Sequence, residues 1–109
     1  MAVVRTKKSR TGVEMVSFTV RMTFAAEDRQ EIGEMLRGLA EASRLEPGCV
    51  TYIPHTVVGD PDTVVIYEQY RDEKAAEAHR QTEHFKRYAI RGLYQRMRER
   101  EREDLAALI

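Results

Sequence analysis

Residues 16–24 alternate strictly between apolar and polar side chains, and this pattern constrains the fold more than any other feature of the sequence. The apolar positions are Val16, Phe18, Val20, Met22 and Phe24. Successive side chains of a β-strand point to opposite faces, so a period of two is typical of a strand with one buried face. The chain is therefore expected to contain a sheet that is apolar on one side.

The segment after this strand predicts a helix over residues 27–45. Apolar residues recur there at spacings of three and four and form one stripe, and Pro47 with Gly48 ends the segment. Gly33 and Gly38 lie within the helix and weaken it by up to about 1 kcal/mol each relative to alanine. They either permit close packing or are simply tolerated.

Residues 49–57 and 63–71 predict two strands of a hairpin, joined by a turn over residues 59–62. Pro54 lies within the first of them. Proline lacks the backbone donor that a central strand needs, so this strand is expected at an edge or with a bulge.

The C-terminal third predicts two helices followed by a strand. Asp72 is a candidate cap for a short helix that ends near His79, and Thr82 for a longer one. Residues 98–103 alternate arginine with glutamate, which a strand would place on opposite faces. A strand near residues 101–105 is favoured, and a helical continuation is the alternative.

This order of elements is the β-α-β-β-α-β arrangement of a ferredoxin-like α+β fold, with a four-stranded antiparallel sheet. Helices on one face leave the other face bare, and a homodimer can bury it. We expect one domain over residues 15–109, preceded by a flexible basic tail over residues 1–14. An anion-binding arm is the alternative interpretation of the tail.

Composition excludes several classes of function. Lysine and arginine number 18 and so do aspartate and glutamate, a balance that argues against nucleic-acid binding. Cys49 is the only cysteine, so no disulfide forms within the chain, and we expect a structural role for it in a cytoplasmic setting. The sequence shows neither a secretory signal nor an apolar run of the roughly 18 residues that a membrane span needs.

Four segments together resemble the antibiotic biosynthesis monooxygenase family. They are Phe18-Thr-Val-Arg-Met-Thr-Phe24, Glu46-Pro-Gly-Cys-Val-Thr-Tyr52, Val65-Ile-Tyr-Glu-Gln-Tyr70, and Ala75-Ala-x-x-His79 with Thr82-Glu-His84-Phe85. No single motif is specific, but their order and spacing agree from about residue 16 to residue 105. The resemblance implies a dimeric α+β barrel with a pocket between sheet and helices in each protomer.

The resemblance also implies a chemistry. Many members of the family oxidise quinols, anthrones or related polycyclic phenols with dioxygen and use neither metal nor flavin. A related branch degrades haem with an asparagine, a tryptophan and a histidine, and this chain places Val20, Tyr70 and Ala89 at those positions. Haem degradation is therefore disfavoured, and no cofactor is expected.

Such an oxidation needs an apolar pocket, a base, and donors for a developing oxyanion. His79, His84 and Glu68 are the candidate catalytic residues, because imidazole and carboxylate groups exchange protons with a bound hydroxyl. In the alternative interpretation His79 only fixes the helix junction, His84 is solvated, and Glu68 forms a salt bridge. No third metal ligand is evident beside the histidines, so no metal site is expected.

Aromatic residues are the candidates for substrate binding. Each of them is also compatible with an ordinary place in the core, and His55 is expected at the surface. The candidates are Tyr70, Tyr52, Tyr67, Phe85 and Tyr88.

The sequence thus predicts a cofactor-independent monooxygenase of a quinol, anthrone or similar phenol, in polyketide or antibiotic biosynthesis. Its expected partners are a small aromatic substrate, dioxygen and a second copy of the chain, with neither nucleic acid nor membrane. The alternatives are a non-catalytic dimeric ligand-binding module and a polyketide cyclase or isomerase that uses the same pocket.

Overall fold

The alternating segment forms strand β1 (Val16–Thr23) in the computed structural model, which describes residues 14–108. Its apolar side chains are buried, and the polar ones between them are partly or fully exposed. β1 pairs with β3 (Asp60–Tyr70) on one side and with β4 (Glu99–Leu105) on the other. The predicted strand is confirmed. The predicted tail lies outside the described residues, apart from Glu14.

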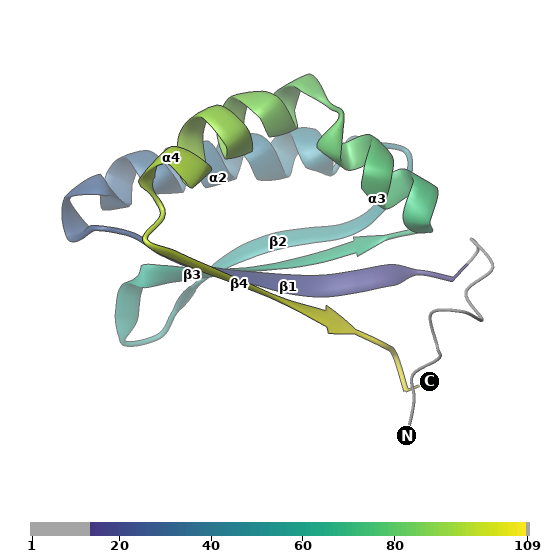
Figure 1. Cartoon of the computed structure of the whole chain (residues 1–109), viewed down its shortest axis with the longest axis horizontal. Helices are drawn as coiled ribbons and strands as arrows, with labels where there is room; N and C mark the ends of the chain where they lie inside the picture. The colour runs from purple at the N-terminus through teal and green to yellow at the C-terminus, as the bar shows by residue number, and fades with distance from the viewer. Residues whose placement is uncertain (1–13, 109) are drawn as a thin grey trace.

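The sheet has the strand order β2-β3-β1-β4, and all neighbours are antiparallel (Figure 1). β2 (Cys49–Val57) is an edge strand, as Pro54 predicted. The turn after it is tighter than expected, because Gly59 adopts a positive φ of 85° and lets β3 begin at Asp60. The prediction of a turn through residue 62 was therefore wrong.

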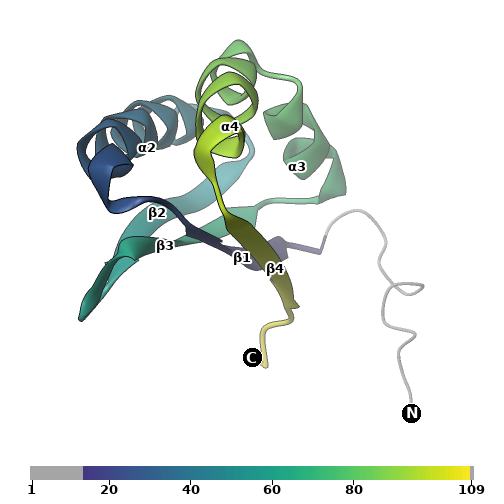
Figure 2. The same cartoon turned by 60° about the vertical axis from the view of Figure 1, so that its left-hand side comes forward.

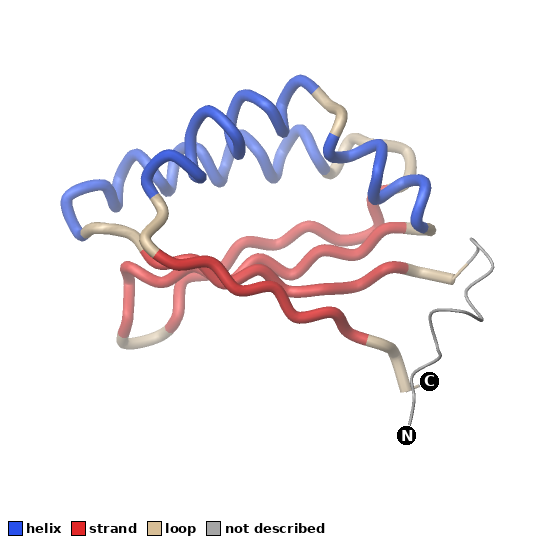
Figure 3. Tube along the Cα trace, in the orientation of Figure 1, coloured by secondary structure: helices blue, strands red, loops and turns tan. Residues whose placement is uncertain are grey.

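Helices cover one face of the sheet, and the described part of the chain places nothing on the other face (Figures 2 and 3). The helix expected over residues 27–45 is a short 3-10 turn, η1, followed by α2. None of the helices in residues 14–108 is long and apolar enough to cross a membrane. The helical elements are η1 (Ala26–Asp28), α2 (Arg29–Ser43), α3 (Glu73–Arg80), the π-helical η2 (Phe85–Leu93) and α4 (Tyr94–Arg96).

Side-chain caps place the break between the two C-terminal helices. Asp72 accepts a hydrogen bond from the backbone N–H of Ala75 at 2.8 Å and starts α3. The hydroxyl of Thr82 accepts one from the N–H of Phe85 at 3.1 Å, just before η2. Both predicted caps are confirmed. The break between α3 and η2 places the end of α3 and the start of η2 over the sheet.

The C-terminal alternation of arginine and glutamate forms a strand, as favoured. Arg102 lies opposite Val20 and Arg100 opposite Met22, so both arginines share the face that carries the core. The guanidinium of Arg102 lies 3.7 Å from the ring centroid of Phe18. The glutamates of β4 consequently occupy the uncovered face of the sheet.

The two glycines of α2 have different surroundings. A Cβ atom on Gly33 would meet nothing within 4 Å, whereas one on Gly38 would lie 2.7 Å from Cζ of Tyr88. Gly38 therefore permits close approach of the Tyr88 ring, and Gly33 is merely tolerated.

We predict that Gly33→Ala raises the free energy of unfolding by about 0.5–1 kcal/mol, because alanine restricts the unfolded chain and favours the helix. Gly38→Ala should lose this gain to overpacking, which costs about 1–3 kcal/mol. Urea denaturation measures both. In a Tyr88→Leu background Gly38→Ala should become stabilising, and equal effects of the two alanines in the wild-type chain would contradict the argument.

Candidate functional site

A cavity lies between the sheet and the helices, and its wall is mainly apolar. Phe18, Val20 and Ile66 contribute from the sheet, and Ala89 and Leu93 from η2. Its volume is about 50 Å³. Since one water needs roughly 10–15 Å³ by this measure, the cavity holds only a few waters as it stands.

Glu68 brings a carboxyl group to this apolar wall. Strand alternation points Glu68 and Tyr70 toward the helices, and both are buried. The Tyr70 hydroxyl donates a hydrogen bond to Oε1 of Glu68 at 2.7 Å. Burial raises the pKa of Glu68 above its ordinary value, although the Tyr70 hydrogen bond and nearby positive groups oppose the shift. Burial and the adjacent Glu68 also raise the pKa of Tyr70.

His79, in the last turn of α3, lies between two carboxyl groups. Its side chain is 4% exposed, Nδ1 lies 2.9 Å from Oε2 of Glu46, and Nε2 lies 3.9 Å from Oε1 of Glu68. The rings of Tyr70 and Phe85 lie within 5.2 Å and 5.1 Å of it, measured between centroids. This packing holds the imidazole in one orientation.

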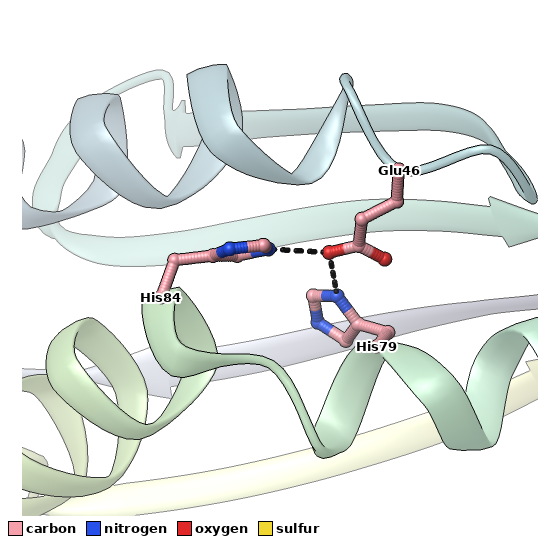
Figure 4. A group of neighbouring side chains, drawn as sticks. All are labelled: Glu46, His79 and His84. Carbon is pink, nitrogen blue, oxygen red and sulfur yellow. Dashed lines mark hydrogen bonds and ion pairs between the residues drawn. The ribbon is translucent and has the colours of Figure 1, made fainter.

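Glu46 is the centre of a hydrogen-bonded cluster (Figure 4). It lies just after α2, and its Oε2 atom accepts from Nδ1 of His79 and from Nε2 of His84, the latter at 2.5 Å. Burial alone would raise the pKa of Glu46, but the two histidine hydrogen bonds outweigh it and lower the pKa. The cluster thus favours an ionised carboxylate.

An ionised Glu46 determines which nitrogen of His79 is free. A carboxylate accepts hydrogen bonds and donates none, so a neutral His79 must carry its proton on Nδ1. Nε2 is then left with its lone pair toward Glu68 and the cavity. This is the arrangement in which a carboxylate orients a histidine base.

Glu46, His79 and His84 also offer three metal-ligand atoms within 4.8 Å of one another, a third donor that sequence reasoning missed. A tetrahedral zinc site separates such atoms by roughly 3.3–3.6 Å, given bonds of about 2.0–2.2 Å. Nδ1 of His79 lies at a hydrogen-bond distance of 2.9 Å from Oε2, and Nε2 of His84 lies closer still, so both nitrogens are nearer to this oxygen than ligands of a shared zinc would be. We therefore interpret the cluster as hydrogen-bonded.

Of the predicted aromatic residues, Tyr52 and Phe85 line the cavity. Burial, and after it Glu68, raises the pKa of Tyr52 well above its ordinary value. Tyr67 pairs with Thr19 and Ile53 and so faces away from the helices, while Tyr88 packs beside Gly38.

Three further residues differ in how far they are buried and in whether they line the cavity. His55 is exposed on β2, as expected. Cys49 is half-buried, and burial, together with nearby Glu46 and Glu68, raises the pKa of its thiol to about 11. Tyr94 lines the cavity although the sequence did not single it out, because its position follows from the π-helical turns before it.

Comparisons with known proteins agree with this fold. The family model described as "Antibiotic biosynthesis monooxygenase" matches residues 15–90. A Bacillus subtilis protein named "Putative monooxygenase YcnE" is 33% identical over 66 residues, which cover 61% of this chain and 70% of that protein.

Solved structures are similar over most of the chain. Protein PA3566 from Pseudomonas aeruginosa has a TM-score of 0.81 and 30% identity, covering 88% of this chain and 96% of its own. A Bacteroides thetaiotaomicron protein, described as a putative antibiotic biosynthesis monooxygenase, has a TM-score of 0.82 and 31% identity, covering 88% and 91%.

The two carboxyl groups beside His79 should affect stability with opposite dependence on pH. The folded state raises the pKa of Glu68, so Glu68→Gln should stabilise the protein increasingly as pH rises above the unfolded-state value of 4.5. The folded state lowers the pKa of Glu46, so Glu46→Gln should cost most above pH 4.5 and progressively less in acid. Urea denaturation from about pH 2.5 to pH 8 measures both, because the effect of Glu46 is lost only below pH 4.5. Parallel pH profiles for the two variants would contradict the assignment.

Proposed function

This chain belongs to the antibiotic biosynthesis monooxygenase family, and on that basis we propose that it oxidises an electron-rich phenol or enol, such as a quinol or an anthrone, with dioxygen and no cofactor. The observation that carries the proposal is His79, whose Nε2 atom faces Glu68 across 3.9 Å at the wall of an apolar cavity. Glu46 holds the imidazole from its other side.

The gap between His79 and Glu68 suits a substrate oxygen. A distance of 3.9 Å is too long for a direct hydrogen bond, yet one hydroxyl oxygen can lie about 2.8 Å from both atoms. A phenol bound there would donate its proton to Nε2 of His79 and accept from a protonated Glu68. The raised pKa of Glu68 supports this assignment of His79 as the proton acceptor and Glu68 as the hydrogen-bond donor, because a neutral carboxyl group can donate to an oxyanion.

The reaction balances without an external reductant. His79 removes a proton, and the resulting enolate passes one electron to dioxygen; the radical pair then forms a carbon–peroxide bond. The imidazolium returns its proton to the distal peroxide oxygen. Loss of the remaining C–H proton and cleavage of the O–O bond then release water and form a carbonyl group. Anthrone and dioxygen thus yield anthraquinone and water.

An aromatic ring needs more room than the cavity offers, so we infer that its mouth opens on binding. Arg100 and Arg102 are exposed and lie over the rings of Tyr94 and Phe18. Exposed arginine side chains can change rotamer at low cost, so the two guanidinium groups can move to the rim of the mouth and admit a substrate ring.

We predict oxygen uptake above the buffer rate when the protein is incubated with anthrone or a hydroquinone. His79→Gln should lower the rate by about 10²–10⁴-fold, the usual range for a general base. Glu68→Leu, which removes the donor to the oxyanion, should lower it by about 10²–10³-fold. An oxygen electrode and chromatography of anthraquinone measure the outcome.

His55→Gln is the matched control, because His55 is exposed on an edge strand, and it should keep the wild-type rate. Uptake at the buffer rate across a panel of anthrones and quinols would favour a ligand-binding module. Conversion of a polyketide substrate under argon, to a product of the same oxidation state, would favour a cyclase or isomerase.

We also propose that two copies pair through the uncovered face of the sheet. Ile53 and Tyr67 are register neighbours on that face, and Val65 lies beside them. Ile53 is 42% exposed, so pairing would remove apolar surface from water.

Light scattering after size exclusion should then give about twice the chain mass of 12.6 kDa at micromolar concentration. Ile53→Glu should shift the protein toward monomer, because it buries a charge in the interface. Val58→Glu, in the fully exposed hairpin turn, should leave the mass unchanged. A wild-type monomer would rule out the pairing.

A further inference from the structure

Arginine side chains give the mouth of the cavity a positive charge, and the reaction proposed for the interior gives that charge no role. Among residues 14–108, three arginines line the cavity, and Glu68 is the only acidic residue of the lining. Glu68 is buried, and the arginines come from α3 and β4. They are Arg80, Arg100 and Arg102.

From this we propose that the substrate is an aromatic acid, whose carboxylate is held at the cavity mouth by Arg100 and Arg102 while its ring enters the cavity. The proposal rests on the proposed function for the ring-binding role of the cavity. It adds the chemical class of the substrate and the residues that select it.

The guanidinium groups are placed for such a contact. Cζ of Arg102 lies over the ring of Phe18, 3.7 Å from its centroid, and Cζ of Arg100 lies over the ring of Tyr94 at 5.4 Å. A guanidinium group carries its N–H groups in one plane, from which they can donate to a carboxylate in pairs.

Existing ion pairs leave this charge largely available. Arg102 pairs with exposed Asp104 at 3.0 Å, and Arg80 pairs with exposed Glu77. Arg100 has no ion pair within residues 14–108. An exposed pair contributes little, so a ligand carboxylate can compete for these groups.

Protection of β4 as an edge strand does not by itself explain why two arginines of this strand line the cavity. Charges on an edge strand discourage unwanted pairing whichever sign they have. In β4, Arg100 and Arg102 face the cavity and the glutamates face away from it, while Asp104 shares the arginine face and pairs with Arg102 at 3.0 Å. Edge protection would be served by either sign of charge at the two positions that line the cavity, yet both carry arginine.

The test compares two probes of nearly equal size, naphthalene-2-carboxylate and naphthalene-2-carboxamide, by calorimetry on the whole chain. Neither probe is a substrate for oxidation, so binding is read independently of activity. The carboxylate should bind at least about tenfold more tightly at low ionic strength, and the preference should shrink near 1 M salt, where the screening length falls to about 3 Å.

The double variant Arg100→Gln with Arg102→Gln should abolish the preference while the carboxamide keeps its affinity, which shows that the cavity is intact. Arg37→Gln is the control for loss of an arginine charge away from the cavity mouth, because Arg37 is exposed on α2; it should leave the preference unchanged. Equal affinities for the two probes, a preference that survives the double variant, or no binding of either probe would each overturn the inference. Selective binding of the carboxylate probe, together with no oxygen uptake above the buffer rate from anthrones and quinols, would instead overturn the proposed function alone.

Discussion

A single carboxylate, Glu46, joins parts of the chain that are far apart in sequence. It accepts hydrogen bonds from His79 at the end of α3 and from His84 just before η2, so the two helices meet at one charged oxygen. Because a carboxylate only accepts, it also decides which nitrogen of His79 is free. The orientation of the base, and with it the proposed chemistry, depends on this contact.

The two carboxyl groups beside His79 differ because their surroundings differ. Glu46 has two imidazole donors and a lowered pKa, whereas Glu68 has an apolar wall, one tyrosine hydroxyl and a raised pKa. Such a contrast is how a protein obtains an acid and a base from the same kind of side chain. In the proposed function, this contrast gives the orienting role to Glu46 and the role of hydrogen-bond donor to Glu68.

Close packing of the helices limits the space in which this chemistry can occur. A Cβ atom on Gly92 would lie 2.9 Å from Sδ of Met35, so glycine lets η2 approach α2. The π-helical turns of η2 carry Phe85, Ala89 and Leu93 to the cavity wall. The cavity that results is small, so in the proposed function a substrate would enter only after the exposed arginines of β4 move.

Local patterns in the sequence were enough to determine the order of elements, the edge position of β2, both helix caps and the side of the sheet that is buried. These features depend on neighbouring residues, through strand alternation, proline's missing donor and side-chain caps. The same alternation put Glu68 and Tyr70 on one face. Only the tertiary structure decided which side chains meet: Glu46 reaches His79 across 33 residues and His84 across 38, and Tyr67 turns away from the cavity. Those contacts depend on how the helices pack on the sheet, and no short-range pattern records that packing.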